Sequence, residues 1–186
     1  MNDSQVPVFI KGEIIDLVPL NSKNINLYVK WENTPNVRIY SRNIIPNTVE
    51  DMKKFFEPSK DRMKREINFE VWHKKDKKSI GFGAVNDIDW YGQKGWLGLV
   101  IGEPEYWGQK IGEEVTRLMV EYAFNELNLY LIYAGINSVN IGSWHCAEKN
   151  GFTREATFKK NMYVNGEYYD TFVYSLFKED WLENKK

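Results

Sequence analysis

The chain has 186 residues, of which 42% are hydrophobic, 15% aromatic and 27% charged, so it has enough apolar surface to fold and is not a disordered polymer. A net charge of -1 makes nucleic acid an improbable partner, and one cysteine with two histidines excludes an internal disulfide and a multi-histidine metal cage. No apolar run reaches the ~18 residues of a membrane span, and the N-terminus lacks a signal-peptide pattern. We therefore expect a cytoplasmic protein with one domain over residues 1–186.

The N-terminal third is expected to hold one strand followed by helices. Residues 13–20 alternate in polarity and are rich in β-branched types, which predicts the first strand. Ser22 is a candidate cap for one helix. Thr48 is a candidate cap for a second helix, which runs through Phe56 and is interrupted at Pro58.

The middle of the chain is rich in predicted strands. Residues 67–73, 79–90 and 95–101 form three short apolar runs separated by polar turns, which predicts a meander of antiparallel strands. A helix is predicted over residues 109–127, because apolar residues recur there at helical spacing on one face. These residues are Val115, Leu118, Met119, Tyr122, Ala123 and Leu127.

A parallel pair of strands is predicted around this helix. Residues 130–136 form a nearly unbroken apolar strand, and they follow a helix that itself follows strand 95–101. This order is that of a right-handed parallel crossover, so the two strands should run side by side in the same direction.

The C-terminal part is expected to contain a helix and a hairpin. Residues 141–149 form the helix, which should stop at Asn150 and Gly151. Residues 152–164 and 167–177 form two strands joined by Asn165-Gly166, which is a strong hairpin signal. The sequence thus predicts a mixed α/β sheet whose ends are antiparallel.

The segment from Gly102 to Glu113 is the most informative loop. The first turn of a helix leaves roughly four N–H groups free and carries about half a positive charge, so a phosphate is held there without a specific side chain. Gly108 and Gly112 would let an anion approach the backbone, and Lys110 could add a cation. In the alternative interpretation, Gly108 only serves a turn and Gly112 a helix-on-sheet contact. Neither the triphosphate-loop pattern nor the dinucleotide pattern occurs.

Several motifs together resemble the GNAT superfamily of acetyl-CoA-dependent N-acetyltransferases. The resemblance is closest to the branch of ribosomal-protein N-terminal acetyltransferases and spermidine acetyltransferases. The stretch from Leu99 to Trp181 carries the motifs in order, and the N-terminal part around residues 18–20 and 31–37 is also similar. The motifs are Glu103-Pro104-Glu105-Tyr106-Trp107-Gly108, Asn140, Glu148-Lys149-Asn150-Gly151-Phe152, Asn165-Gly166 and Asp170.

The resemblance implies a fold and a coenzyme site. The fold would be a mostly antiparallel, seven-stranded sheet with a central pair of splayed parallel strands and about four flanking helices. In the family a turn wraps the coenzyme A pyrophosphate, and it falls here on Trp107, Gly108, Gln109, Lys110, Ile111 and Gly112. Lys110 replaces a glycine of the family pattern, and we expect its N–H to remain usable if its φ stays negative.

The resemblance also implies how the rest of the coenzyme is held. The pantetheine arm would pair with the edge of the preceding strand at Leu99, Val100 and Ile101, and Asn140 would contact the arm from the other side. Two parallel strands that splay apart expose unpaired amides, which an amide-containing ligand can fill.

At several positions where the family carries catalytic residues, this sequence has other residue types. Many members have a tyrosine that protonates the sulfur, and Ala147 stands at that position, so Ser143 is the candidate proton donor. Trp96 and Met162 stand where relatives carry glutamates, so the general base is unknown. The remaining carboxylates are more typical of surface or turn roles than of a base. They are Asp87, Asp89, Glu103 and Asp170.

We therefore expect an N-acetyltransferase that uses acetyl-CoA as cosubstrate, needs no metal and transfers the acetyl group directly to a primary amine. The acceptor is open between a protein N-terminus, a polyamine and a small-molecule amine, and a homodimer is one option for its assembly. Two rival interpretations are a catalytically silent acyl-CoA-binding regulator and a plain nucleotide-binding module. Five aromatic residues could line an acceptor cleft or fill the core. They are Trp31, Tyr40, Trp90, Trp96 and Tyr163.

Overall fold

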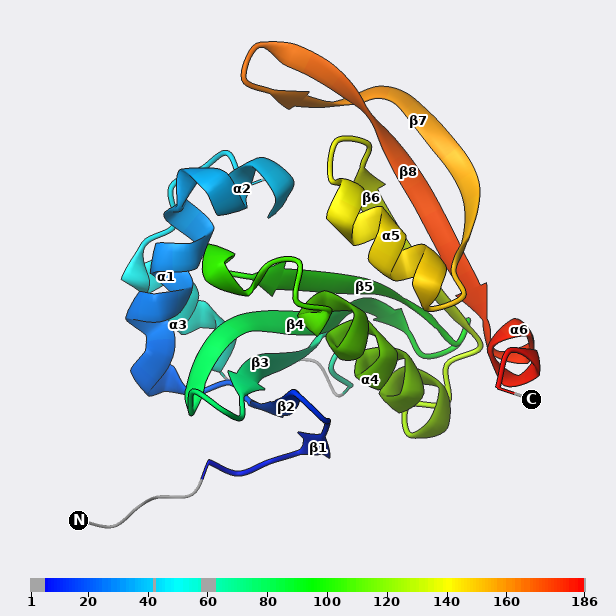
Figure 1. Cartoon of the computed structure of the whole chain (residues 1–186), viewed down its shortest axis with the longest axis horizontal. Coiled ribbons are helices and arrows are strands. Elements are labelled where there is room, and N and C mark those ends of the chain that lie inside the picture. The colour runs from blue at the N-terminus through cyan, green and yellow to red at the C-terminus, as the bar shows by residue number, and fades with distance from the viewer. Residues whose placement is uncertain (1–5, 42, 58–62, 186) are drawn as a thin grey trace.

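The computed structural model describes residues 6–41, 43–57 and 63–185 and shows one twisted sheet with helices on both faces (Figure 1). Within these residues the sheet has eight strands in the order β1-β2-β3-β4-β5-β6-β8-β7. The strands are β1 (Ile10–Lys11), β2 (Ile15–Pro19), β3 (Ile67–His73), β4 (Lys78–Asp89), β5 (Lys94–Ile101), β6 (Leu131–Asn137), β7 (Thr153–Val164) and β8 (Glu167–Phe177). All neighbouring strands are antiparallel except β5 and β6.

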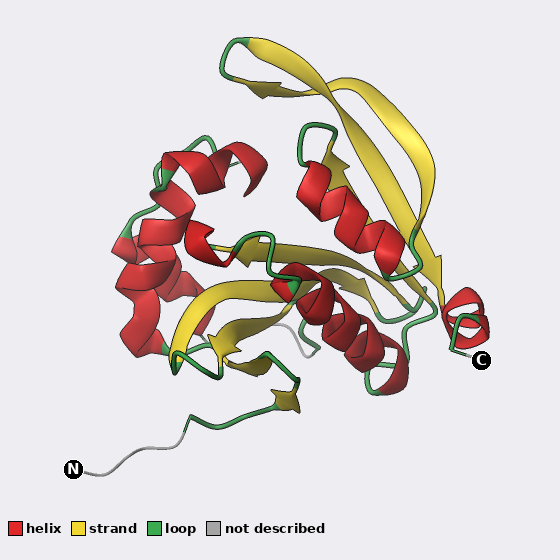
Figure 2. Ribbon diagram, in the orientation of Figure 1, coloured by secondary structure: helices red, strands yellow, loops and turns green. Residues whose placement is uncertain are grey.

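Six α-helices and three short 3-10 helices accompany the sheet in the described part of the chain (Figure 2). The α-helices are α1 (Ile25–Asn33), α2 (Pro35–Ser41), α3 (Val49–Lys53), α4 (Ile111–Asn125), α5 (Ile141–Lys149) and α6 (Lys178–Glu183). The 3-10 helices are η1 (Ser22–Asn24), η2 (Lys54–Phe56) and η3 (Pro104–Tyr106). None of these helices is long and apolar enough to cross a membrane.

The mixed α/β fold expected from the sequence is confirmed, with corrections in the short elements. The sheet has eight strands rather than seven, because the two-residue β1 adds to its edge beside β2. Six α-helices stand in place of about four, because α2 and α6 span only one or two turns and carry no clear periodicity. Asn21, rather than Ser22, provides the first cap by accepting from the Lys23 N–H.

The second helix of the N-terminal part is shorter than expected. Thr48 does cap α3, and it forms a capping box with Asp51. The α-helix then ends at Lys53, and the chain continues as the 3-10 turn η2 to Phe56. Pro58, the predicted interruption, lies outside the described residues.

Helix α4 and helix α1 lie on opposite faces of the sheet. Phe82 of β4 contacts Tyr28 and Trp31 of α1, whereas a Cβ placed on the next residue, Gly83, would come within 2.7 Å of the Met119 sulfur of α4. Because successive residues of a strand point to opposite faces, the two helices cover opposite sides of β4. The predicted apolar face of α4 is buried in the main core, apart from Leu127 beyond its end, which is partly buried.

The predicted parallel pair is present, but it is short. Strand β5 pairs with β6 only at Lys94, Gly95 and Trp96, opposite Leu131, Ile132 and Tyr133. Beyond Trp96, β5 continues to pair with β4, and β6 continues to pair with β8. The two strands therefore separate, and a gap opens between their C-terminal halves.

The C-terminal hairpin follows its sequence signal. Asn165 and Gly166 both have positive φ, 50° and 91°, as a two-residue turn between right-twisted strands requires. The hairpin of β7 and β8 extends away from the rest of the sheet (Figure 1).

Candidate active site

The turn between β5 and α4 holds two residues in the left-handed region. Gly108 has φ 74° and Lys110 has φ 62°. The expectation that φ of Lys110 stays negative is therefore wrong, because this lysine takes a backbone conformation that usually favours glycine. The turn needs this conformation to bring the chain from η3 into the first turn of α4, and Lys110 is the residue that directly precedes the helix.

Consecutive backbone amides are free in this turn. Trp107 donates to the Pro104 carbonyl, and Glu114 donates to the Lys110 carbonyl, but the N–H groups of residues 108–113 have no acceptor among the described residues. Such a row of donors at the positive end of a 15-residue helix matches the requirements of a bound phosphate group.

The two glycines in the turn differ in what surrounds them. A Cβ on Gly108 would meet no atom within 4 Å, so its side of the turn is open. A Cβ on Gly112 would lie 3.3 Å from the Cys146 sulfur of α5 and 3.8 Å from Leu99. Gly112 thus serves close packing. The helix-on-sheet contact of the alternative interpretation is present at Leu99 of β5, but the tighter contact is with α5.

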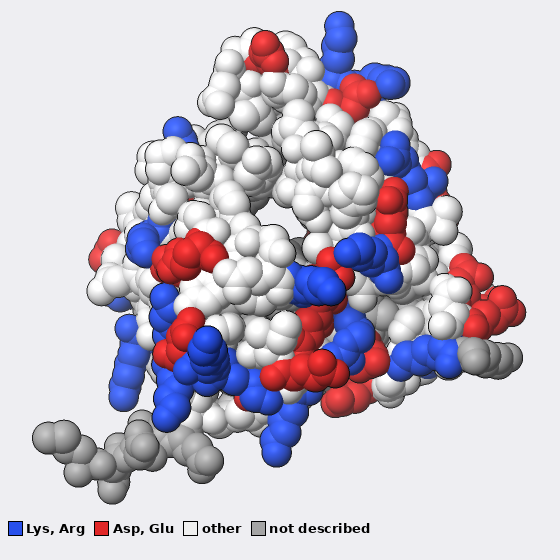
Figure 3. All heavy atoms as spheres, in the orientation of Figure 1, with Lys and Arg blue, Asp and Glu red and all other residues white. Residues whose placement is uncertain are grey.

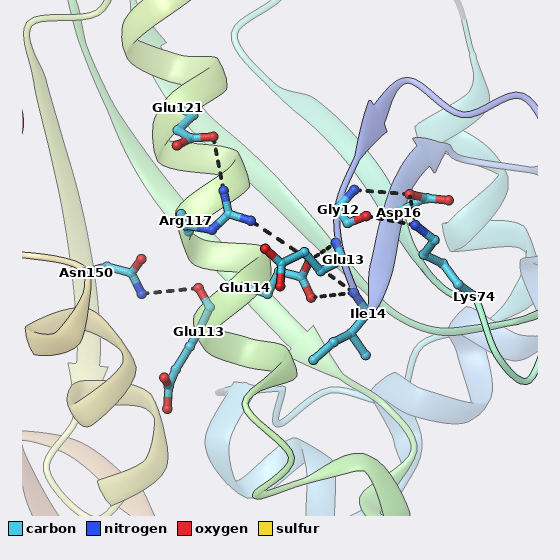
Figure 4. A network of polar contacts seen from close by, with 10 residues as sticks. All are labelled: Gly12, Glu13, Ile14, Asp16, Lys74, Glu113, Glu114, Arg117, Glu121 and Asn150. Carbon is cyan, nitrogen blue, oxygen red and sulfur yellow. Dashed lines mark hydrogen bonds and ion pairs between the residues drawn. The ribbon is translucent and has the colours of Figure 1, made fainter. Parts of the chain in front are cut away.

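The first turn of α4 is held in place from its other side. Figure 4 shows the Glu114 carboxylate pointing at the chain between β1 and β2, where it accepts from the N–H groups of Glu13 and Ile14, the latter at 3.1 and 3.2 Å. Glu114 is buried, with 8% exposure. On the α5 side, Lys149 contacts the Glu113 carboxylate at 2.8 Å, and Asn150 donates to the Glu113 carbonyl. These contacts fix the orientation of the free amides.

The gap between β5 and β6 exposes part of the β5 backbone. The Gly102 N–H donates to Ile80 of β4, and in an antiparallel ladder alternate residues face the same neighbour. Val100 therefore faces β4, whereas Leu99 and Ile101 face the gap. Of the three residues predicted to pair with the pantetheine arm, only these two offer free backbone groups to it.

Trp107 closes one end of this edge. Its indole N–H donates to the Ile101 carbonyl at 2.8 Å, and its ring lies edge-to-face with Tyr40 of α2 at 6.1 Å between centroids. The Ile101 carbonyl is therefore occupied, while the amides of Leu99 and Ile101 and the Leu99 carbonyl remain on the gap side.

Asn140 and Ser143 lie at the start of α5. Because β5 and β6 are parallel, α4 and α5 both begin at the same edge of the sheet, which brings Asn140 and Ser143 to the end where the gap opens. The Asn140 side-chain oxygen caps α5 by accepting from the Ser143 N–H at 3.2 Å. The side-chain amide of Asn140 and the hydroxyl of Ser143 have no partner among the described residues.

Three of the four candidate carboxylates have structural roles, and the fourth, Asp87, lies on the surface. Asp89 accepts from the Gly92 N–H at 2.8 Å, and this hydrogen bond lowers its pKa. An ion pair with Lys159 at 2.8 Å lowers the pKa of Asp170. Partial burial raises the pKa of Glu103, but hydrogen bonds from Lys30 and Trp31 lower it overall. Asp87 is exposed. The structure therefore points to no general base among the four.

The aromatic residues proposed for an acceptor cleft lie in different parts of the structure. Trp31 is fully buried in a second core cluster with Tyr28 and Met52, so it is not part of a cleft. Trp96 and Tyr133 form a tilted ring pair across the last paired position of β5 and β6, with ring centroids 5.0 Å apart. Sequence analysis missed Tyr133, because only the register of the parallel pair brings it beside Trp96.

Cys146 lies next to the turn but has the properties of a packing residue. Its side chain is partly buried, and burial followed by the nearby Glu113 carboxylate raises the pKa of its thiol. A thiol with a raised pKa is mostly protonated and a poor nucleophile. The described residues contain no group of three or more potential metal ligands.

Comparison with known proteins identifies the class that this fold and site define. Residues 15–153 match the family model described as the acetyltransferase (GNAT) domain. The chain therefore belongs to the GNAT acetyltransferases, is an N-acetyltransferase, and comes from a family that uses acetyl-CoA.

Individual relatives agree with this assignment. The chain is 32% identical over 136 residues to "Probable N-acetyltransferase YjcK" of Bacillus subtilis, covering 72% of this chain and 75% of that protein. It is 29% identical over 87 residues to the spermidine N(1)-acetyltransferase of Escherichia coli K12, covering 47% of each. The structure of spermidine N-acetyltransferase from Vibrio cholerae in complex with CoA and spermine has the same fold, with a TM-score of 0.83, 20% identity and coverage of 92% and 99%.

Proposed function

We propose that this protein transfers the acetyl group of acetyl-CoA directly to a primary amine, and that residues 1–186 form a single domain for this reaction. The observation that carries the proposal is the row of free amides at residues 108–113, directly beside the open edge of β5. The amides bind the pyrophosphate, and the Lys110 ammonium adds a positive charge. Trp107 contributes through its contact with Ile101 rather than through its amide, which is already bonded.

The pantetheine arm of acetyl-CoA lies along the gap between β5 and β6. The free backbone groups of Leu99 and Ile101 replace the missing ladder partner for the amides of the pantetheine arm. Asn140 contacts the arm with its side-chain amide from the opposite wall. This places the thioester toward the closed end of the gap, near Trp96 and Tyr133.

The acetyl group moves from sulfur to nitrogen in one displacement, without an acetylated enzyme. The neutral amine nitrogen forms a bond to the thioester carbonyl carbon, an N–H of the strand edge stabilises the oxyanion, and the C–S bond breaks to release the thiolate. Water accepts the proton of the amine, because Asp89, Glu103 and Asp170 are held in structural contacts and Asp87 is an exposed surface residue. Ser143 donates a proton to the thiolate, whose reference pKa of about 8.5 also makes solvent an adequate donor.

The assignment as an enzyme argues against a catalytically silent regulator. The remaining rival is a module that binds a plain nucleotide instead of acetyl-CoA. The test is to mix the purified protein with acetyl-CoA and an amine panel, and to follow thiol release and the thermal shift on adding CoA or ATP. We expect release with at least one amine and a larger shift with CoA than with ATP. Absence of release with every amine, or equal shifts with ATP and CoA, would contradict the proposal.

Ser143→Ala tests the proton donor. If the hydroxyl protonates the thiolate, kcat falls by more than about tenfold while the KM for acetyl-CoA is unchanged. Ser138→Ala is the matched control, because its hydroxyl lies before α5 and has no partner among the described residues. A loss below tenfold in Ser143→Ala would show that solvent protonates the sulfur.

A further inference from the structure

On the sheet face opposite α4 and α5, the gap between β5 and β6 begins at two aromatic residues and continues between two glycines. The rings of Trp96 and Tyr133 contact each other at the last paired position in a tilted arrangement, with an interplanar angle of 30°. Two residues further along each strand, on the same face by strand alternation, stand Gly98 on β5 and Gly135 on β6. Both strands therefore lose their side chains at the point where they separate.

This arrangement leaves a hollow next to the aromatic pair. A Cβ on Gly98 would meet only one side chain within 4 Å, the Asn86 amide at 3.0 Å, and Gly135 is exposed. From the α4 and α5 side, the space-filling view shows an opening between α2, α5 and β5 that is rimmed mainly by uncharged side chains, so the gap is also accessible from that side (Figure 3). Because α4 and α5 flank the gap there, an acceptor reaches the thioester from the opposite face, which carries the aromatic pair.

The sheet around the hollow is neutral. The segments 82–86, 96–100, 133–137 and 171–175, which bring four adjacent strands to this region, contain no charged residue. Glu103, just beyond β5, is already bound to Lys30 and Trp31. Two other carboxylates lie near this face. Glu155 accepts from the Ser175 hydroxyl at 2.6 Å, but it is an exposed residue of the edge strand β7. Glu32 of α1 is partly buried and lines a cavity with Phe82 of β4 and Met52 of α3.

We infer that the acceptor is a monoamine with an uncharged aromatic body, which stacks on the Trp96 and Tyr133 rings while its single amine reaches the thioester. This inference rests on the proposed function and narrows its substrate class. An aromatic body gains ring–ring contacts with this pair. A polyamine, by contrast, would have to bring one or two further ammonium groups over neutral side chains at the gap. Glu32 does not compensate for the lost hydration there, because it lines a cavity beside Phe82 to which neither β5 nor β6 contributes a residue.

The test compares phenethylamine, spermidine and a short neutral peptide with a free N-terminus as acceptors for the wild-type chain. We expect kcat/KM for phenethylamine to exceed that for spermidine by about tenfold or more, and to exceed that for the peptide. A spermidine value equal to or above that for phenethylamine, or a preference for the peptide, would overturn the inference.

Three variants then test whether the aromatic pair is responsible. Trp96→Leu should lower kcat/KM for phenethylamine by about fivefold to tenfold, mainly through KM, because it removes the ring contact. Trp96→Phe keeps a ring and should lose less than Trp96→Leu. Tyr91→Leu is the matched control, because it removes a fully exposed aromatic ring between β4 and β5, and it should stay within about twofold of the wild type. The thermal shift with acetyl-CoA reports folding and cosubstrate binding in all three. An unchanged KM in Trp96→Leu would contradict the inference.

The two proposals fail in different ways. No thermal shift with acetyl-CoA and no thiol release with any amine would refute the acetyl transfer itself. Thiol release with spermidine or the peptide, but not with phenethylamine, would leave the transfer intact and refute only the aromatic monoamine.

Discussion

The left-handed turn before α4 makes a specific prediction for Gly108→Ala. Gly108 has φ 74°, and its missing side chain faces open space, so an alanine causes no clash and only the backbone conformation opposes it. The left-handed region costs a residue with a Cβ about 1–2 kcal/mol. Because nothing packs on this side of the turn, the free variant can relax to another conformation and must regain the original one to present its amides. The cost therefore appears in binding, as a rise in the Kd for CoA of about 5- to 30-fold.

Gly166→Ala is the matched control for this measurement. Gly166 also has positive φ, 91°, and open space around its Cβ position, but it lies at the tip of the β7–β8 hairpin. It should lose stability, with a melting temperature lower by about 2–6 °C, and keep the wild-type Kd. Both values come from calorimetric titration with CoA and from thermal unfolding. An unchanged Kd in Gly108→Ala, or equal increases in both variants, would refute the role given to this turn.

Three further predictions concern stability. Glu114→Ala leaves two backbone amides without their acceptor and should cost about 2–4 kcal/mol, lowering the melting temperature by about 5–12 °C. Glu121→Ala should be nearly neutral, because the ion pairs of Glu121 with Arg117 and Lys185 are partly exposed to solvent. Similar shifts in both variants would contradict this prediction. Lys110→Gly relieves the left-handed backbone strain, so its melting temperature should be no lower than that of the wild type. Lys110→Val should lower the melting temperature by a few degrees. The reverse order would exclude strain at this position. Burial raises the pKa of Glu32, so its charge opposes folding as the pH rises through that pKa. In urea unfolding, Glu32→Gln should be more stable than the wild type at pH 7 and equal to it near pH 4. A constant difference at both pH values would count against burial as the cause.

The anchoring of α4 also connects stability to binding. Glu114 and the Lys149–Glu113 pair hold the first turn of α4 against the β1–β2 turn and against α5, on the sides away from the free amides. Packing thus satisfies the polar groups that are not needed for the ligand and leaves the row at residues 108–113 unpaired. The same contacts that stabilise the fold orient the donors.

Local signals in the sequence determined the long elements of this protein. The apolar repeat of α4, the strand–helix–strand order around it and the Asn165-Gly166 turn each act over a few residues, so they could be recognised without the rest of the chain. The family motifs likewise located the turn at residues 107–112. Helices such as α2 and α6 were missed, because so few turns carry no periodicity and depend on tertiary contacts.

Tertiary structure decided what the site residues can do. The positive φ of Lys110, the direction of the Val100 backbone toward β4 and the indole bond from Trp107 to Ile101 follow from how β5 is paired and where the chain must enter α4. The pairing of Trp96 with Tyr133 depends on the register between strands more than 30 positions apart in the sequence. Register and backbone direction are set by the packing of the whole sheet, and a one-residue slip would reverse them, so no local pattern specifies them.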